Sequence, residues 1–173
     1  MATIRNHPSN ARNAIRRSLA CTVLATMLAL LTLASTVSAQ EAPPNIRTLL
    51  SSEGFAATVE RLEQAIADEG LTLLTTIDHA ANAENVGLEL RPTTVLLFGN
   101  PEVGTPLMQA APTLALDLPQ RMLVWENEVG DVFVTWRDPT VLASEHGLQP
   151  DQAPLPNIAA LLEALAQTAT GTP

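Results

Sequence analysis

Cysteine, lysine and tyrosine are almost missing from this chain of 173 residues. Its single cysteine is Cys21, and it contains no lysine and no tyrosine. We expect the N-terminal segment that holds Cys21 to be removed, so the remaining chain has no thiol. This excludes disulfides, thiolate metal sites and cysteine nucleophiles. Stability must then come from an apolar core, and residues 40–173 are long enough for one domain that buries about two thirds of its unfolded surface.

Positive charge is also scarce. The chain carries nine basic residues, all arginine, against eighteen acidic ones. Four of the arginines lie in the N-terminal segment, so its removal leaves five arginines against all eighteen acids, a formal charge of −13. Nucleic acids and anionic membrane surfaces attract basic patches. The composition therefore excludes both as partners and favours a soluble acidic domain.

The first 39 residues have the three parts of a secretory signal peptide. Arginines are followed by an uncharged apolar run from Leu19 to Val37, and Val37-Ser38-Ala39 supplies small residues for cleavage before Gln40. An uncleaved membrane anchor is the alternative, since a spanning helix needs about 20 apolar residues. Threonine and serine interrupt the run, which favours cleavage after Ala39 and a secreted or periplasmic protein with no membrane contact after cleavage.

Hydrophobic periodicity and turn residues predict the elements that follow. We expect strands at 46–50, 71–77, 93–98, 113–116, 122–125 and 132–136. We expect helices at 55–69, at 80–86, from about 100 to 111, from 139 to about 146, and at 158–165. Strict β-α-β alternation is missing. The pattern favours an α+β fold, a two-layer sandwich with a mostly antiparallel sheet and helices on one face.

Helix starts and strand faces can also be predicted. Ser51 or Ser52 can cap the first helix and Asn157 the last one. The helix after Gly99 has two possible starts, with Asn100 as cap and Pro101 first, or with Thr105 as cap and Pro106 first. In the strand at 93–98 the apolar centre is continuous, which indicates burial on both faces or a central position. Trp125 and Trp136 lie on facing hairpin strands, where they can pair across the sheet.

A family resemblance extends over about residues 46–148. The residues that carry it are Ile77-Asp78-His79, then 87–93 (GLELRPT), Phe98-Gly99-Asn100-Pro101, 104–108 (GTPLM), Asp117-Leu118-Pro119, and 136–139 (WRDP). In combination these motifs resemble the family of domains of unknown function 302 (DUF302). The resemblance implies a small two-layer α+β domain that forms a homodimer, and it implies no reaction. The chain then divides into a signal peptide (1–39), a linker (40–45), the DUF302-like domain (46–148), and a connector with a C-terminal amphipathic helix (149–173).

Polar residues at strand ends and turns are the best candidates for a site, because sites are concentrated there. The leading hypothesis is a non-enzymatic exported domain that binds a small ligand or a protein partner at His79, Arg91, Asn100, Thr105 and Asp117. A helix start near Asn100 or Thr105 offers backbone N–H groups to a small anion, with Arg91 as its partner. Turn and cap chemistry alone also explains the Gly, Asn and Pro residues of this segment.

Two other hypotheses use the histidines. A metal or haem site would combine His79 with His146 and Asp117, or with Met108, and copper suits the softer set that contains Met108. Neither histidine has a second ligand at a typical spacing, so the sequence requires no cofactor. An enzyme would use His79 as general base with Asp117. Because no nucleophile motif is present and Ser144-Glu145-His146 is merely consecutive, the sequence favours a binding role over catalysis.

Overall fold

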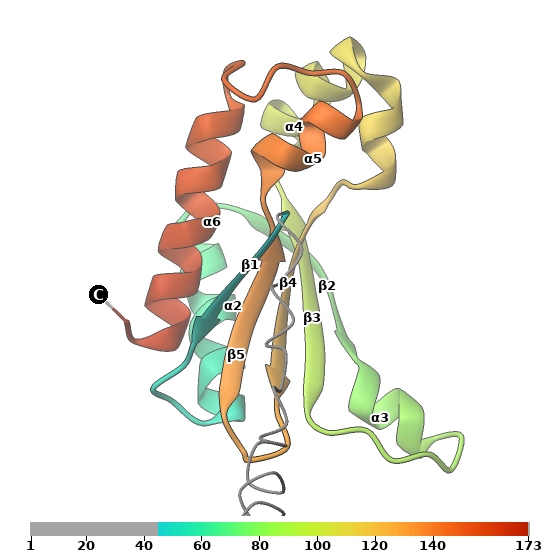
Figure 1. The fold of residues 1–173 in the computed structure, drawn as a ribbon, viewed down its shortest axis with the longest axis vertical. Helices are drawn as coiled ribbons and strands as arrows, with labels where there is room; N and C mark the ends of the chain where they lie inside the picture. The colour runs from blue at the N-terminus through green and yellow to red at the C-terminus, as the bar shows by residue number, and fades with distance from the viewer. Residues whose placement is uncertain (1–44, 173) are drawn as a thin grey trace, which may run out of the picture. The chain divides into compact units, whose positions relative to one another are not determined.

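The computed structural model describes residues 45–172, so the predicted signal peptide and most of the linker lie outside the described residues. Eleven elements follow one another along this part of the chain (Figure 1). Their bounds are β1 (Ile46–Leu50), α2 (Phe55–Asp68), β2 (Thr72–Asp78), α3 (His79–Glu84), β3 (Thr93–Gly99), α4 (Pro101–Ala110), the 3-10 helix η1 (Pro112–Leu116), β4 (Gln120–Glu126), β5 (Val132–Arg137), α5 (Pro139–Glu145) and α6 (Leu155–Thr170).

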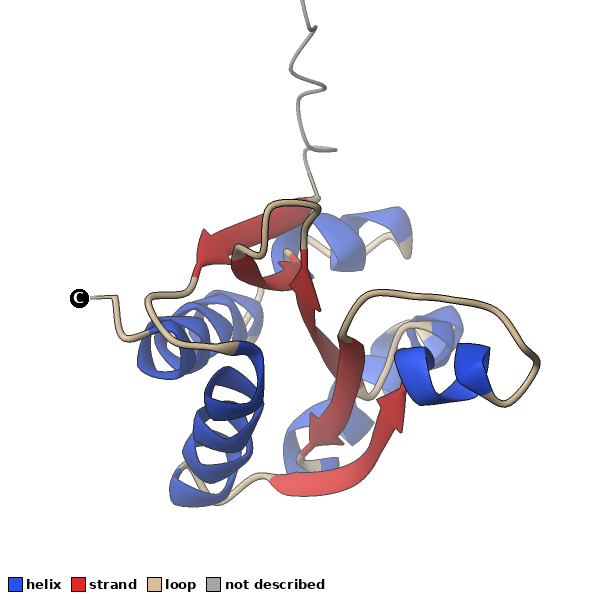
Figure 2. Cartoon of the chain, turned by 90° about the horizontal axis from the view of Figure 1, so that it is seen from below, coloured by secondary structure: helices blue, strands red, loops and turns tan. Residues whose placement is uncertain are grey.

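The five strands form one antiparallel sheet in the order β1-β5-β4-β3-β2. Helices α2 and α6 cover one face of it, as Figure 2 shows from below. This is the predicted α+β sandwich with an antiparallel sheet. In β3 every second residue is buried, so this strand is covered on one face only and the predicted burial on both faces is not found. It lies inside the sheet, between β4 and β2.

The main core lies between the sheet and the two long helices. Its centre is formed by side chains that are almost fully buried: Leu62, Ile66, Leu96, Phe98, Met122, Val124, Val134, Leu162 and Leu165. A second, smaller core lies where α4, η1, α5 and the start of α6 meet, and it is made of Leu107, Ala111, Leu114, Ala143, Leu148 and Leu155. Because α6 contributes to both cores, it is part of the same domain and holds the two together.

Three local predictions are wrong, each for a physical reason. Residues 112–116 form a 3-10 helix instead of a strand, because Pro112 is placed at a helix start and Leu114 turns into the second core. Helix α6 begins at Leu155, ahead of Asn157, with Pro154 at the cap position. At α2 the cap position is Gly54, and Ser51 Oγ instead accepts from the Glu53 amide.

The two tryptophans do not pair. Strand alternation puts Trp136 on the helix-covered face, opposite Met122, while Trp125 lies on the other face. Trp125 stacks there on Phe133, with ring centroids 4.8 Å apart and planes at 23°. The sequence places the two tryptophans on facing strands but does not give the register, and the register decides their partners.

Candidate functional site

The predicted site residues fall into groups at opposite ends of the sheet. His79 follows β2 and Arg91 precedes β3, so both lie at the end where Asp78 pairs with Thr94. Asn100 and Thr105 follow the other end of β3. Since β3 has seven residues at about 3.3 Å each, roughly 20 Å of strand separates the two groups. The predicted convergence of His79, Arg91 and Thr105 is therefore wrong.

The start of α4 settles the choice between its two possible caps. Asn100 Oδ1 accepts from the Glu102 amide at 2.8 Å, and Pro101 occupies the first helical position. The Val103 and Gly104 amides donate to the Asn100 carbonyl. Pro101 has no N–H, and the next three amides are engaged within the chain. The geometry that an anion site here would need, with Arg91 beside free amides, is absent from the described residues.

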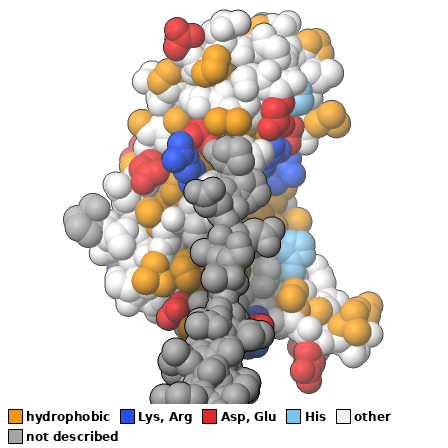
Figure 3. All heavy atoms as spheres, in the orientation of Figure 1, with side chains coloured by type: hydrophobic (Ala, Val, Ile, Leu, Met, Phe, Trp, Pro, Cys, Tyr) orange, Lys and Arg blue, Asp and Glu red, His pale blue; other side chains and the backbone are white. Residues whose placement is uncertain are grey.

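Asp117 and His146, which the sequence brought together only in the metal hypothesis, form a direct pair. His146 Nε2 lies 2.8 Å from Asp117 Oδ2, and His146 Nδ1 lies 2.9 Å from Thr113 Oγ1. Asp117 also accepts a hydrogen bond from Arg137 Nη1 at 3.0 Å. Arg137 in turn forms an ion pair with Glu145 at 3.1 Å. Charged side chains of both signs gather in this upper part of the molecule in Figure 3. The network ties η1 to α5, so Asp117 is a structural anchor and has no contact with His79.

Metal binding by the predicted residues finds no geometric support. His146 lies with Asp117 beyond the Arg137 end of β5, while His79 lies at the opposite end of the sheet. Within residues 45–172 no three His, Cys, Asp or Glu side chains are grouped so that they could hold a metal ion. Met108 lies in α4, where it lines the cavity described next.

A cavity of about 540 Å³ lies where α4 and α6 meet the ends of β2 and β3. Most of its lining is apolar: Leu71, Leu74, Phe98, Pro101, Val103, Leu107, Met108, Leu118, Pro119, Ile158, Leu161 and Leu162. The polar side chains are Thr72, Asn100, Thr105, Gln120 and the exposed Glu69. Three of the predicted residues line this cavity: Asn100 and Thr105 from the ligand hypothesis, and Met108 from the metal hypothesis.

Most of the cavity was missed because its walls come from segments far apart in the sequence. Leu74 is the extra residue of a β-bulge, since Leu73 pairs with Phe98 and Thr75 with Leu97. Its side chain remains 59% exposed. Ile158 and Leu161 come from the apolar face of α6. That face was recognised in the sequence, but only the fold shows that it continues past the core into a hollow.

One carboxylate has a shifted pKa. Asp138 is the cap of α5, where it accepts from the Thr140 amide and hydroxyl and from Arg47 Nη2 at 2.8 Å. Burial alone would raise the pKa of Asp138, but the hydrogen bonds from Thr140 and Arg47, together with the positive charge of Arg47, outweigh burial and lower it. This site joins β1 to α5 and stands apart from the cavity.

Comparison with known proteins agrees with this fold. The family model described as "Domain of unknown function DUF302" matches residues 47–167. The chain belongs to the DUF302 family. The match includes most of α6, so the DUF302 domain extends beyond residue 148 into the C-terminal helix, as the shared core also indicates.

Curated relatives carry this sequence type within longer proteins. The chain is 44% identical over 101 residues to Fluoride-specific ion channel FluC 1 of Brucella suis biovar 1, covering 58% of this chain and 40% of the relative. A FluC 2 of Brucella melitensis biotype 1 has the same identity over 37% of its length. The chain thus spans about two fifths of the length of the relatives that it matches. Within residues 45–172 no helix is both long and apolar enough to cross a bilayer.

A solved structure has the same fold. An uncharacterized conserved DUF302 protein from Bacillus stearothermophilus superposes with a TM-score of 0.67 at 21% identity. The superposition covers 73% of this chain and 99% of that one.

Proposed function

We propose that this DUF302 domain binds a small, uncharged and mostly apolar molecule in the cavity between α4 and α6. The observation that carries the proposal is the size and chemistry of the hollow. Its volume of about 540 Å³ lies within the range of ligand sites in proteins, which are lined mainly by apolar side chains with few polar groups. We propose no reaction, because the cavity brings together no acid–base pair and no nucleophile.

The lining sets the class of ligand. No arginine or histidine lines the cavity, and its single charged side chain is the acidic Glu69. An anionic ligand would lose its hydration without gaining a cation, which is unfavourable. The uncharged polar residues Asn100, Thr105 and Gln120 offer hydrogen bonds to a hydroxyl or carbonyl group. An apolar chain or ring with one neutral polar end therefore fits best.

We further propose that the domain acts outside the cytoplasm. This part rests on the N-terminal pattern of arginines, apolar run and Val37-Ser38-Ala39. The mass of the protein isolated from its cells would decide it. A chain beginning at Gln40 agrees with export and cleavage, and an intact chain of 173 residues that stays in the cytosolic fraction contradicts export.

The ligand proposal predicts that 1-octanol stabilises residues 40–173 against thermal unfolding. A ligand that binds only the folded state at 100 times its dissociation constant adds about 2.7 kcal/mol. For a domain of this size that corresponds to an increase in Tm of roughly 10 °C. Octanoate, which has the same chain and a carboxylate, is the matched ligand and is expected to have a much smaller effect. If neither octanol nor a ring alcohol such as cyclohexanol raises Tm at low concentration, the proposal fails.

A further inference from the structure

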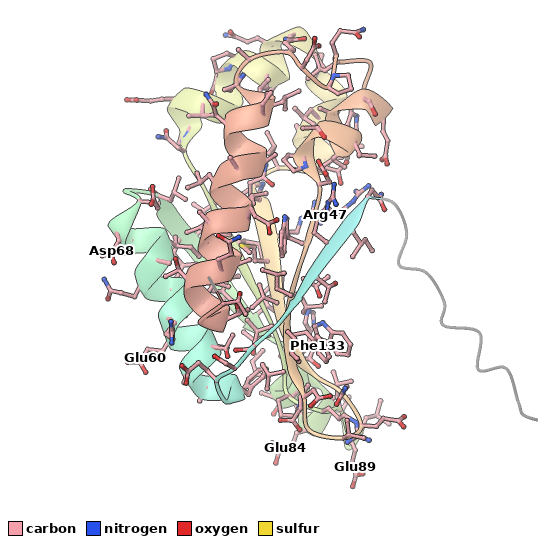
Figure 4. All side chains as sticks on the ribbon, turned by 60° about the vertical axis from the view of Figure 1, so that its left-hand side comes forward. Arg47, Glu60, Asp68, Glu84, Glu89 and Phe133 are labelled. Atoms are coloured by element: carbon pink, nitrogen blue, oxygen red, sulfur yellow. The ribbon has the colours of Figure 1, made fainter. Side chains whose placement is uncertain are left out.

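The cavity between α4 and α6 has an exposed mouth and a buried inner end. The mouth is formed by exposed side chains, among them Glu69, Thr72, Leu74, Val103 and Thr105. Figure 4 shows Asp68, the residue before Glu69, at the outer surface of the domain. At the inner end, Phe98, Leu107 and Leu162 are almost fully buried. A polar group of a ligand that reaches the inner end loses its water there and needs a partner from the protein.

Gln120 places a carboxamide at this inner end. It is the first residue of β4, and it pairs with Phe98 of β3. Residues directly opposite each other in antiparallel strands carry their side chains on the same face. Phe98 lies on the face that the helices cover, so the side chain of Gln120 starts beside it on that face. Gln120 is partly buried and lines the cavity.

The carboxamide of Gln120 is free to bind a ligand. Within residues 45–172 no hydrogen bond joins it to another group, although it offers one acceptor oxygen and two N–H donors. Gln120 also lines a second hollow of about 210 Å³ together with Asp117, Arg121 and Arg137. Those three are engaged elsewhere, because Asp117 binds Arg137 and His146, and Arg121 donates to the Leu116 carbonyl.

The other polar side chains of the cavity lining cannot take this role. Glu69, Thr72 and Thr105 are exposed at the mouth, where water competes for their hydrogen bonds. Asn100 is partly buried, but its Oδ1 already accepts from the Glu102 amide, which leaves only the Nδ2 donor. Of the lining residues that the structure describes, Gln120 alone is partly buried and offers both a donor and an acceptor.

We propose that the carboxamide of Gln120 binds the polar end of the ligand and so selects its chemical class. The ligand is an apolar molecule whose neutral end carries a donor for Gln120 Oε1 and an acceptor for Nε2, as an alcohol or an amide does. An ether or a tertiary amide can only accept, so it would cover Oε1 without giving it a donor, which is costly. This inference rests on the proposed function and narrows it.

The same contact sets the orientation of the ligand. Its polar end lies inside, beside Phe98 and Gln120, and its apolar part extends between α4 and α6 toward Val103 at the mouth. The reverse orientation would leave the amide of Gln120 covered by apolar groups without a partner. Polar residues at the mouth, such as Thr105, then contribute little to affinity because they remain in contact with water.

Two matched pairs of ligands test the selection by Gln120. 1-Octanol is compared with 1-methoxyoctane, and octanamide with N,N-dimethyloctanamide, since the second member of each pair has lost its donor. The ratio of the two dissociation constants is measured in the native protein and in Gln120→Leu, so that the different hydrophobicity of the ligands cancels. For at least one pair, Gln120→Leu should reduce the preference for the donor by about fivefold to tenfold, the worth of one hydrogen bond. The pair with the larger change tells whether an alcohol or an amide is the better match.

Controls separate this inference from the proposed function. Gln109→Leu changes an exposed glutamine of α4 outside the cavity and should leave both ratios unchanged. Gln120→Met, with an unbranched side chain of similar length, serves as a second variant if Gln120→Leu loses its native circular dichroism spectrum. A native protein that binds none of the four ligands refutes the proposed function and this inference together. Binding by the native protein with ratios that Gln120→Leu leaves unchanged refutes the role of Gln120 alone.

Nuclear Overhauser effects test the orientation without a substitution. In the complex of the native protein with 1-octanol, the protons beside the hydroxyl group should show contacts with the ring of Phe98. The terminal methyl group should show contacts with the methyl groups of Val103 at the mouth. A terminal methyl group that contacts Phe98, with the hydroxyl end at Val103, would overturn the proposed orientation and the contact with Gln120.

Discussion

Replacement of Gly104 by leucine is expected to weaken binding of 1-octanol at least tenfold while the domain stays folded. Gly104 lies in α4 on the wall of the cavity, and a Cβ added there would be 3.6 Å from Leu118 Cδ1 and 4.0 Å from Met108 Cε. Those are ordinary van der Waals distances, so the backbone accepts a side chain. Because those nearest neighbours also line the cavity, the branched end of leucine would occupy space that a ligand needs.

Alanine at the same position separates the two effects of the change. Gly104→Ala adds only the Cβ, so affinity should change little. A glycine inside a helix costs roughly 0.5–1 kcal/mol relative to alanine, so this variant should be more stable by about that amount. Isothermal titration with octanol and urea unfolding measure the two quantities. A Gly104→Leu variant that binds octanol as tightly as the native domain would show that the ligand lies elsewhere.

Replacement of Asp138 by alanine is expected to lower the free energy of unfolding by about 2 kcal/mol, at the upper end of the range for a lost helix cap. Asp138 is 8% exposed and accepts from both the amide and the hydroxyl of Thr140. It also accepts hydrogen bonds from Nε and Nη2 of Arg47, which lies on β1. Asp151→Ala, at an exposed acid in the connector, is the control and should cost less than 0.5 kcal/mol. Equal urea midpoints for the two variants would contradict this role of Asp138.

The same carboxylate gives stability a dependence on pH. Its pKa in the folded state lies below the ordinary value, so the unfolded chain binds the proton more readily. The contribution of Asp138 is therefore complete at neutral pH and is lost as the pH falls through the folded pKa in the acid range. Asp138→Asn keeps an acceptor for Thr140 without the charge, so its stability should fall less steeply with acid than that of the native domain.

Local chemistry predicted a large part of this fold, and long-range geometry supplied the rest. The sequence 97–101 (LFGNP) contains residues that favour the end of a strand and the start of a helix, and Asn100 with Pro101 starts α4 here. Asp138 with Pro139 starts α5 in the same way. The site depended instead on the length and order of strands. His79 and Arg91 are close to Asn100 along the chain. Strand β3, however, runs from one end of the sheet to the other between Arg91 and Asn100. The cavity joins segments from Glu69 to Leu162, and no local pattern encodes that meeting.

Methyl NMR with ¹³C-labelled methionine tests the cavity most directly. Residues 40–173 contain two methionines: Met108 lines the cavity, and Met122 is fully buried in the core outside it. Titration with 1-octanol should shift the Met108 methyl signal in a saturable way and leave the Met122 signal in place. A Met108 signal that stays still at octanol concentrations that stabilise the domain, or two signals that move together, would contradict binding in the cavity.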